Sequence, residues 1–205
     1  MTPARRARPA EPESLSDQEV VTFAVAGDEW AFRELVRRYE RPIFSLLVRM
    51  VRDRELAEDL SQETFVKVFN AIESYNPDYK FSSWIFKIAN NTAIDVLRRK
   101  EPDVLALEGA PHATSAAEAE ATALQLSAPG ESPLAELEAR QLGTMIEAAI
   151  EKLRPEYRAC ILLRHVEDRP YEEIAEILDL PLGTVKTYIH RARNELRVLL
   201  KEAKE

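Results

Sequence analysis

The chain has 205 residues, of which 45% are hydrophobic and only five are glycine. It is long enough for one large domain or two small ones, and its composition favours helices over sheets and excludes global disorder. The net charge of −8 first argues against DNA binding, but residues 101–141 hold eight acidic residues and one basic residue, and the remainder is nearly neutral. Because local basic faces decide contact with nucleic acid, the acidic total does not exclude it.

The sequence gives no sign of export or of membrane insertion. No segment approaches the roughly 20 apolar residues that a membrane span needs. Residues 1–14 carry three arginines without a following apolar stretch, so they are predicted to be a disordered tail and not a signal peptide. The single cysteine, Cys160, excludes an internal disulfide and lies in an apolar run typical of a buried core residue. A cytoplasmic location is therefore expected.

The first predicted domain spans residues 15–100 and contains four helices. Ser16 and Glu19 have the spacing of a capping box, which opens a short helix. A longer helix starts near residue 28, and Pro42 inside it predicts a kink or a break into two helices. Asp53 is expected to cap the third helix, whose predicted apolar side comprises Leu56, Leu60, Phe65, Val66 and Phe69. Turn residues predict a loop over residues 74–80, before a fourth helix that ends near residue 100.

A linker and a second domain follow. Residues 101–133 are rich in Ala, Glu, Ser and Pro and show no sustained helical or strand period, so they are predicted to be an acidic flexible linker. The second domain spans residues 134–205, with helices expected over 134–152, 155–166 and 170–178 and from 182 to about 200. The predicted fold class is all-α, with two small helical domains joined by the linker.

The last two predicted helices have the shape of a helix-turn-helix. The turn commonly carries glycine, but Asp179 stands there and tolerates the left-handed backbone that this turn needs. The N-terminal half of the last helix is basic and polar, which suits the major groove of duplex DNA. Its candidate DNA-binding residues are Lys186, Thr187, Tyr188, His190, Arg191 and Arg193. The alternative is a helical hairpin with a solvated basic face.

The fourth helix and the loop before it combine aromatic, amide and basic side chains. Such a combination suits unstacked single-stranded bases, which offer π-faces and polar edges. The face opposite the predicted core carries Lys87, Asn90, Asn91, Asp95 and Arg98. In the loop, Tyr75 and Asn76 are better candidates for contact than Trp84, for which a core position is favoured.

The third helix presents an acidic stripe of Glu58, Asp59, Gln62 and Glu63, at spacings of about one turn. Such a stripe repels DNA. Taken alone it is a solvated face, and together with the other surfaces it suits docking to a basic protein surface.

Three motifs in order resemble the sigma-70 family of RNA polymerase sigma factors, and most closely its extracytoplasmic-function group. Residues 59–69, DLSQETFVKVF, are similar to the stretch with which the family grips the polymerase clamp. Residues 80–91, KFSSWIFKIANN, resemble the segment that melts and reads the −10 promoter element. Residues 171–187 resemble the unit that reads the −35 element. Together the motifs cover most of residues 20–200.

The resemblance implies a promoter-recognition subunit that binds core polymerase at the β′ clamp and the β flap, that is inhibited by an anti-sigma factor, and that serves a stress or envelope-response regulon. It assigns polymerase binding to Glu58, Asp59, Gln62, Glu63 and Phe65. It assigns single-stranded −10 DNA to Tyr75, Asn76, Ser82, Lys87, Asn90, Asn91 and Arg98, and the −35 duplex to the candidate residues of the last helix. It implies no cofactor and no metal.

Two other classes of protein remain to be weighed. A helix-turn-helix repressor or activator explains the second domain but leaves the surfaces of the first unused. An enzyme is poorly supported, because the three histidines lie far apart and no glycine-rich phosphate loop is present. For the linker, the acidic composition suggests that it threads the basic channel of polymerase and is displaced by RNA, and a passive tether is the alternative.

Overall fold

The computed structural model describes residues 12–100 and 133–203, and in this part of the chain all regular structure is helical. The predicted all-α fold class is confirmed. The first helical unit contains α1 (Asp17–Val25), α2 (Glu29–Val51), α3 (Arg54–Ala71) and α4 (Phe81–Lys100), with short 3-10 turns at Pro12–Ser14 and Ile72–Ser74. The second unit contains α5 (Pro133–Glu151), α6 (Pro155–His165), α7 (Tyr171–Leu178) and α8 (Leu182–Glu202).

Local sequence signals explain most boundaries of the first unit. Ser16 and Glu19 form the predicted capping box, and the carboxylate of Asp53 accepts a hydrogen bond from the backbone of α3. Gly27 has a φ of 85° in the turn between α1 and α2, a conformation that glycine adopts without strain. Of the two outcomes predicted at Pro42, a break into two helices is wrong, because α2 runs through Pro42 as one helix.

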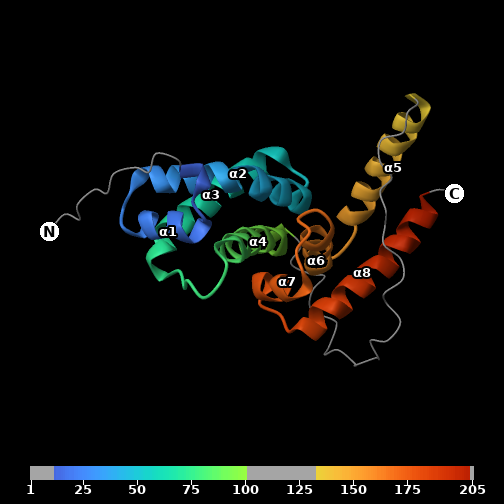
Figure 1. Ribbon diagram of the computed structural model, residues 1–205. Coiled ribbons are helices and arrows are strands. Elements are labelled where there is room, and N and C mark those ends of the chain that lie inside the picture. Colours follow the sequence, from blue (N-terminus) through green and yellow to red (C-terminus); the bar gives the residue numbers. More distant parts are fainter. Residues whose placement is uncertain (1–11, 101–132, 204–205) are drawn as a thin grey trace.

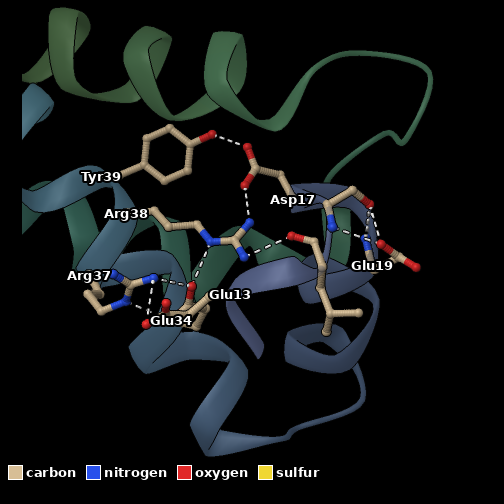
Figure 2. Close-up of polar contacts among 9 residues, drawn as sticks. Glu13, Asp17, Glu19, Glu34, Arg37, Arg38 and Tyr39 are labelled. Carbon is tan, nitrogen blue, oxygen red and sulfur yellow. Dashed lines mark hydrogen bonds and ion pairs between the residues drawn. The ribbon is translucent and has the colours of Figure 1, made fainter. Parts of the chain in front are cut away.

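A partly buried polar network joins the start of α1 to α2 (Figure 2). The guanidinium of Arg38 donates to Asp17, to Glu34 and to the backbone carbonyl of Leu15, while the hydroxyl of Tyr39 donates to Asp17. The hydrogen bond from Arg37 is the main reason that the pKa of Glu34 falls to about 2, since it outweighs the opposing effect of burial. Residues 12–14, assigned to the disordered tail above, thus form a 3-10 turn beside this network.

The turn of the helix-turn-helix follows the prediction. Asp179 has a φ of 56° and a ψ of 46°, which is the left-handed conformation expected there. Val185 of α8 is fully buried, and Ala175 of α7 packs against the same hydrophobic cluster. This local geometry sets the crossing of α7 and α8, which leaves the basic side of α8 exposed.

The two units share one hydrophobic core. In Figure 1, α4 lies between the helices of the first unit and the pair α6 and α7. The buried cluster runs from Ile85 and Phe86 of α4 to Leu163 of α6 and Ile177 of α7. Arg158 of α6, only 8% exposed, donates a hydrogen bond to the carbonyl of Met50 at the end of α2. Because buried apolar area and a buried hydrogen bond join the units, they form one compact body here.

Several expectations fall outside the described ranges. The linker over residues 101–133, its path through polymerase and residues 1–11 of the predicted tail are not covered by the structure apart from Pro133. The division into domains at these boundaries therefore stays a prediction. Among the helices of residues 12–100 and 133–203, none is long and apolar enough to span a membrane.

Candidate polymerase and nucleic-acid interfaces

The predicted docking face lies on the solvent side of α3. Glu58, Asp59, Gln62 and Glu63 are all exposed, and Phe65 is partly buried against the core. Glu58 pairs with Arg54 and Glu63 pairs with Lys67, both one turn along the helix. Within the described residues, no hydrogen bond or ion pair engages Asp59 or Gln62. The stripe is therefore continuous and accessible in this conformation.

Two hydrophobic side chains extend this face. Val66 and Phe69 were predicted to lie on the buried side of α3, and this is wrong, because they are 57% and 60% exposed. The buried side is instead formed by Ala57, Leu60, Ser61, Thr64 and Val68. Spacing could have identified Val66 and Phe69 as exposed: Val66 lies four residues after Gln62 and three after Glu63, and Phe69 lies three after Val66, which places both on the face of the stripe. An apolar end beside an acidic stripe is more typical of a protein interface than of a solvated surface.

A groove of about 860 Å³ continues from this apolar end toward the turn between α1 and α2. Its lining includes Val25, Phe32 and Phe69, and the last two rings pack edge to face at 4.8 Å. Val25 is also 44% exposed. The groove therefore enlarges the hydrophobic part of the α3 face. The name docking face is used below for Asp59, Gln62, Glu63, Val66 and Phe69 together with this groove.

The loop before α4 is held by hydrogen bonds. The side-chain carbonyl of Asn76 accepts from the backbone of Asp78, and the hydroxyl of Tyr75 donates to the carbonyl of Tyr79. Asn76 is exposed, as a base contact requires, but Tyr75 is only 9% exposed and packs against Phe81 and Trp84. Burial raises the pKa of Tyr75. The expectation that Tyr75 is available for contact is therefore wrong, because Tyr75 belongs to the core, while Trp84 is partly buried against the same core.

The second unit covers part of the predicted single-strand face of α4. Lys87 forms an ion pair of 3.4 Å with Asp179, and Arg98 forms one of 3.5 Å with Glu156. Ser82 contacts Glu173 at 3.4 Å, and Asn90 is only 1% exposed. The prediction that Asn90 is exposed is wrong for this conformation, because the second unit packs over its side of α4. Asn91 remains exposed.

The basic side of α8 is open to solvent. Lys186, His190 and Arg191 are exposed, while Thr187 is partly buried and hydrogen-bonds to the carbonyl of Gly183. Farther along the helix, the side chain of Asn194 joins His190 to Arg197 at 3.1 Å on either side. Residues 186, 190, 194 and 197 follow one another at helical spacing, so α8 presents a continuous polar ridge.

Two of the candidate residues on α8 point toward the protein. The ring of Tyr188 packs against Tyr157 of α6, with centroids 5.1 Å apart. Arg193 is partly buried and lies 3.4 Å from a ring nitrogen of His165. Desolvation, followed by the charges of Arg193 and Arg164, lowers the pKa of His165. Both candidates therefore support the fold of the second unit in this conformation.

The single cysteine lies in the hydrophobic core. Cys160 is fully buried, as predicted, and burial raises the pKa of its thiol to about 12. In the part of the chain that the structure describes, no group of three or more metal-ligating side chains occurs.

Comparison with known proteins decides the family. The sequence profile described as Sigma-70 region 2 matches residues 35–102, and that described as Sigma-70, region 4 matches residues 144–196. The ECF RNA polymerase sigma factor SigW of Bacillus subtilis is 37% identical over 176 residues, covering 86% of this chain and 92% of SigW. The chain belongs to the ECF family of RNA polymerase sigma factors. Sigma factors are transcription factors and not catalysts.

Two solved structures share the fold of this ECF sigma factor. CnrH, solved with the cytosolic domain of CnrY, has a TM-score of 0.64 at 23% identity, covering 91% of this chain and 97% of CnrH. RpoE, solved with the anti-sigma factor NepR from Bartonella quintana, has a TM-score of 0.58 at 24% identity, covering 83% of this chain and 96% of RpoE. At these identities the comparisons support the helical architecture.

Proposed function

We propose that this ECF sigma factor binds core RNA polymerase through the docking face of α3 and directs it to promoters that α4 and α8 recognise. The observation that carries the proposal is the exposed docking face, where acidic and apolar side chains adjoin within the region 2 match. In the region 4 match, α8 offers a separate basic ridge for the −35 duplex. A repressor of the helix-turn-helix class has no use for the first surface.

The residue roles in the proposal follow the exposed positions. Asp59, Gln62 and Glu63, with Val66 and Phe69, contact the β′ clamp. Lys186, His190 and Arg191 meet the −35 duplex. Asn76, Asn91 and the basic side chains of α4 hold the unpaired −10 strand, once the second unit has moved off α4. The regulon is a stress or envelope response, and the protein acts in the cytoplasm.

An anti-sigma factor is the proposed inhibitor. Support comes from RpoE of Bartonella quintana, which was solved in complex with the anti-sigma factor NepR. The β flap is proposed as the polymerase contact of the second unit.

The test begins with reconstitution on core polymerase. The purified chain is expected to bind core polymerase without DNA, and the holoenzyme is expected to produce run-off transcripts from a genomic library with shared −35 and −10 sequences. The double charge reversal Asp59→Lys with Glu63→Lys should weaken core binding strongly at native helicity. The matched control, Glu40→Lys with Glu202→Lys, changes the charge equally at exposed positions outside the docking face. Equal affinity of the two variants would show that α3 is not the docking site.

A further inference from the structure

At the contact between α4 and α7, the predicted −10 face of α4 meets acidic side chains of α7, which belongs to the predicted −35-binding helix-turn-helix. Glu173 of α7 lies 3.2 Å from the ammonium of Lys80 and 3.4 Å from the hydroxyl of Ser82. Asp179, which ends α7, pairs with Lys87. Two carboxylates of the second unit therefore pair with two lysines. Lys87 is one of the basic side chains of α4 that the proposed function assigns to the −10 strand, and Lys80 directly precedes α4.

The environment of Glu173 makes its contact stronger than a surface ion pair. Its side chain is 6% exposed, and it also accepts a hydrogen bond of 2.6 Å from Arg169 of the turn between α6 and α7. Burial favours the neutral acid, but the hydrogen bond from Lys80 and the charge of Arg169 keep the pKa of Glu173 below its usual range. Arg169 itself lies over the ring of Phe86 at 4.6 Å, which closes the contact from the α4 side.

Two polar side-chain atoms on α4 indicate that the face of α4 under α7 also binds a second partner. The hydroxyl oxygen of Ser83 and the side-chain oxygen of Asn90 are buried without a hydrogen-bond partner in the described residues. Their positions flank Phe86 and Lys87 by about one helical turn, and both of these contact the second unit. An unpaired buried polar group costs about 1–3 kcal/mol, so a contact that served only packing has no reason to keep two of them.

We propose that Glu173 and Asp179 form an acidic latch, which holds the second unit over the −10 face of α4 in the free protein. This inference rests on the proposed function for the ligand of α4. The −35 and −10 elements lie about 25 base pairs apart, or about 85 Å of B-form duplex, so α7 cannot stay on α4 while both elements are read. The latch must open before both readers engage the promoter.

The latch covers the −10 face and leaves the other two surfaces accessible. Asp59 and Gln62 on α3 are exposed in the closed form, as are Lys186 and His190 on α8. Polymerase can therefore dock on the closed protein. The unpaired −10 strand gains access to α4 only afterwards.

The test measures the distance between the two units in the full chain. Because the native Cys160 is fully buried, nitroxide labels can be placed at Glu40→Cys on α2 and at Val198→Cys on α8 and compared by double electron–electron resonance. The latch variant is Glu173→Gln with Asp179→Asn, since asparagine keeps the left-handed turn. The control is Glu172→Gln with Glu176→Gln, which makes the same charge change on the exposed side of α7.

The wild type and the control should share one short, narrow distance distribution. The latch variant should add a longer and broader population, and so should wild type in high salt, because salt screens the partly exposed pairs. In parallel, a random-sequence single-stranded 12-mer should bind the latch variant roughly three- to tenfold more tightly than the control, as expected for the loss of one or two competing ion pairs.

A broad distribution in the wild type would overturn the latch, as would distances unchanged both in the latch variant and in high salt. The salt series keeps the test decisive if the variant loses helicity. Failure of the proposed function can be distinguished from failure of the latch. In that case the chain does not bind core polymerase, while the label distances still respond to the latch variant and to salt.

Discussion

Glu34 is a residue of the first unit whose ionisation contributes to stability. Its pKa near 2 lies below that of an exposed glutamate, so its ionised form stabilises the folded state. This contribution is complete above about pH 5 and is lost as the pH falls toward the folded pKa. The side chain is nearly buried, but its partner Arg37 is 57% exposed, so water screens part of the interaction.

The first prediction is that Glu34→Gln lowers the free energy of unfolding by about 1–2 kcal/mol at pH 7. The difference from wild type should shrink steadily between about pH 5 and pH 2. Urea unfolding at several pH values measures it. The variant Glu29→Gln, at an exposed position on the same helix, should show a much smaller change. A deficit that persists at pH 2 would mean that packing, and not charge, explains the loss.

The second prediction separates DNA contact from packing on α8. Lys186→Ala should weaken duplex binding by the holoenzyme on specific and random sequences alike, and should lower the slope of log affinity against log salt by about 1. Tyr188→Phe should leave affinity unchanged, because the ring packs on Tyr157 and keeps that contact. Anisotropy titrations at several salt concentrations measure both. A large loss of specific affinity in Tyr188→Phe would place its hydroxyl at the DNA.

At the scale of single elements, the caps explain why the helix boundaries are predictable. Asp53 accepts a hydrogen bond of 3.1 Å from the backbone nitrogen of Leu56, at the start of the helix that carries the docking face. Asp28 also precedes a helix but makes no such bond. The cap at Asp53 therefore stabilises the first turn of α3 directly.

The third prediction is that Asp53→Ala destabilises the protein by about 1 kcal/mol, whereas Asp53→Asn, which can still accept the bond, costs much less. Amide hydrogen exchange should speed up in the first turn of α3 and remain unchanged in α8. Core polymerase affinity should fall modestly in the alanine variant only. Equal stability of the alanine and asparagine variants would rule out the capping role.

Periodicity and turn chemistry thus predict the elements well. They are less reliable in predicting which face of an element is buried. The left-handed Asp179 and the capping box at Ser16 depend on neighbouring residues alone, so the sequence contains the information for them. Phe69 and Asn90 were misplaced because their exposure depends on other elements. Phe69 stays 60% exposed although its ring packs on Phe32 of α2, and Asn90 lies under a unit distant in sequence.

The polymerase-binding and DNA-binding surfaces illustrate the same limit. The motif around Gln62 predicts the position of the acidic stripe on α3, but not the apolar extension by Val66 and Phe69. The basic residues of α8 predict a DNA-binding ridge, but only the packing of α6 shows that Tyr188 is partly buried against Tyr157. Contacts between the two units are invisible to any local pattern.

At the scale of the whole molecule, the contact between the units has the composition of a protein–protein interface. It combines the shared hydrophobic core with a rim of ion pairs, which includes Arg52 at the end of α2 with Glu147 and Glu151 of α5. Buried apolar area supplies the affinity, and the charged rim adds orientation.

The fourth prediction follows from this contact. A protease site inserted within residues 101–132 and then cleaved should leave the two fragments together, so that they elute as one species in size-exclusion chromatography at low salt. In high salt or with Glu173→Gln and Asp179→Asn, part of the material should elute as separate fragments. Complete separation of the wild-type fragments at low salt would show that the units associate only through the linker.

The fit of α7 against α4 also bears on how many molecules of the protein a cell needs. A reader that is available only in the open form binds its target with an apparent dissociation constant divided by the open fraction. If closure is favoured by about 2 kcal/mol, about 3% of free molecules are open and promoter capture weakens about 30-fold. A cell then needs about 30-fold more molecules for the same promoter occupancy, whereas docking on polymerase, which the closed form permits, is not weakened.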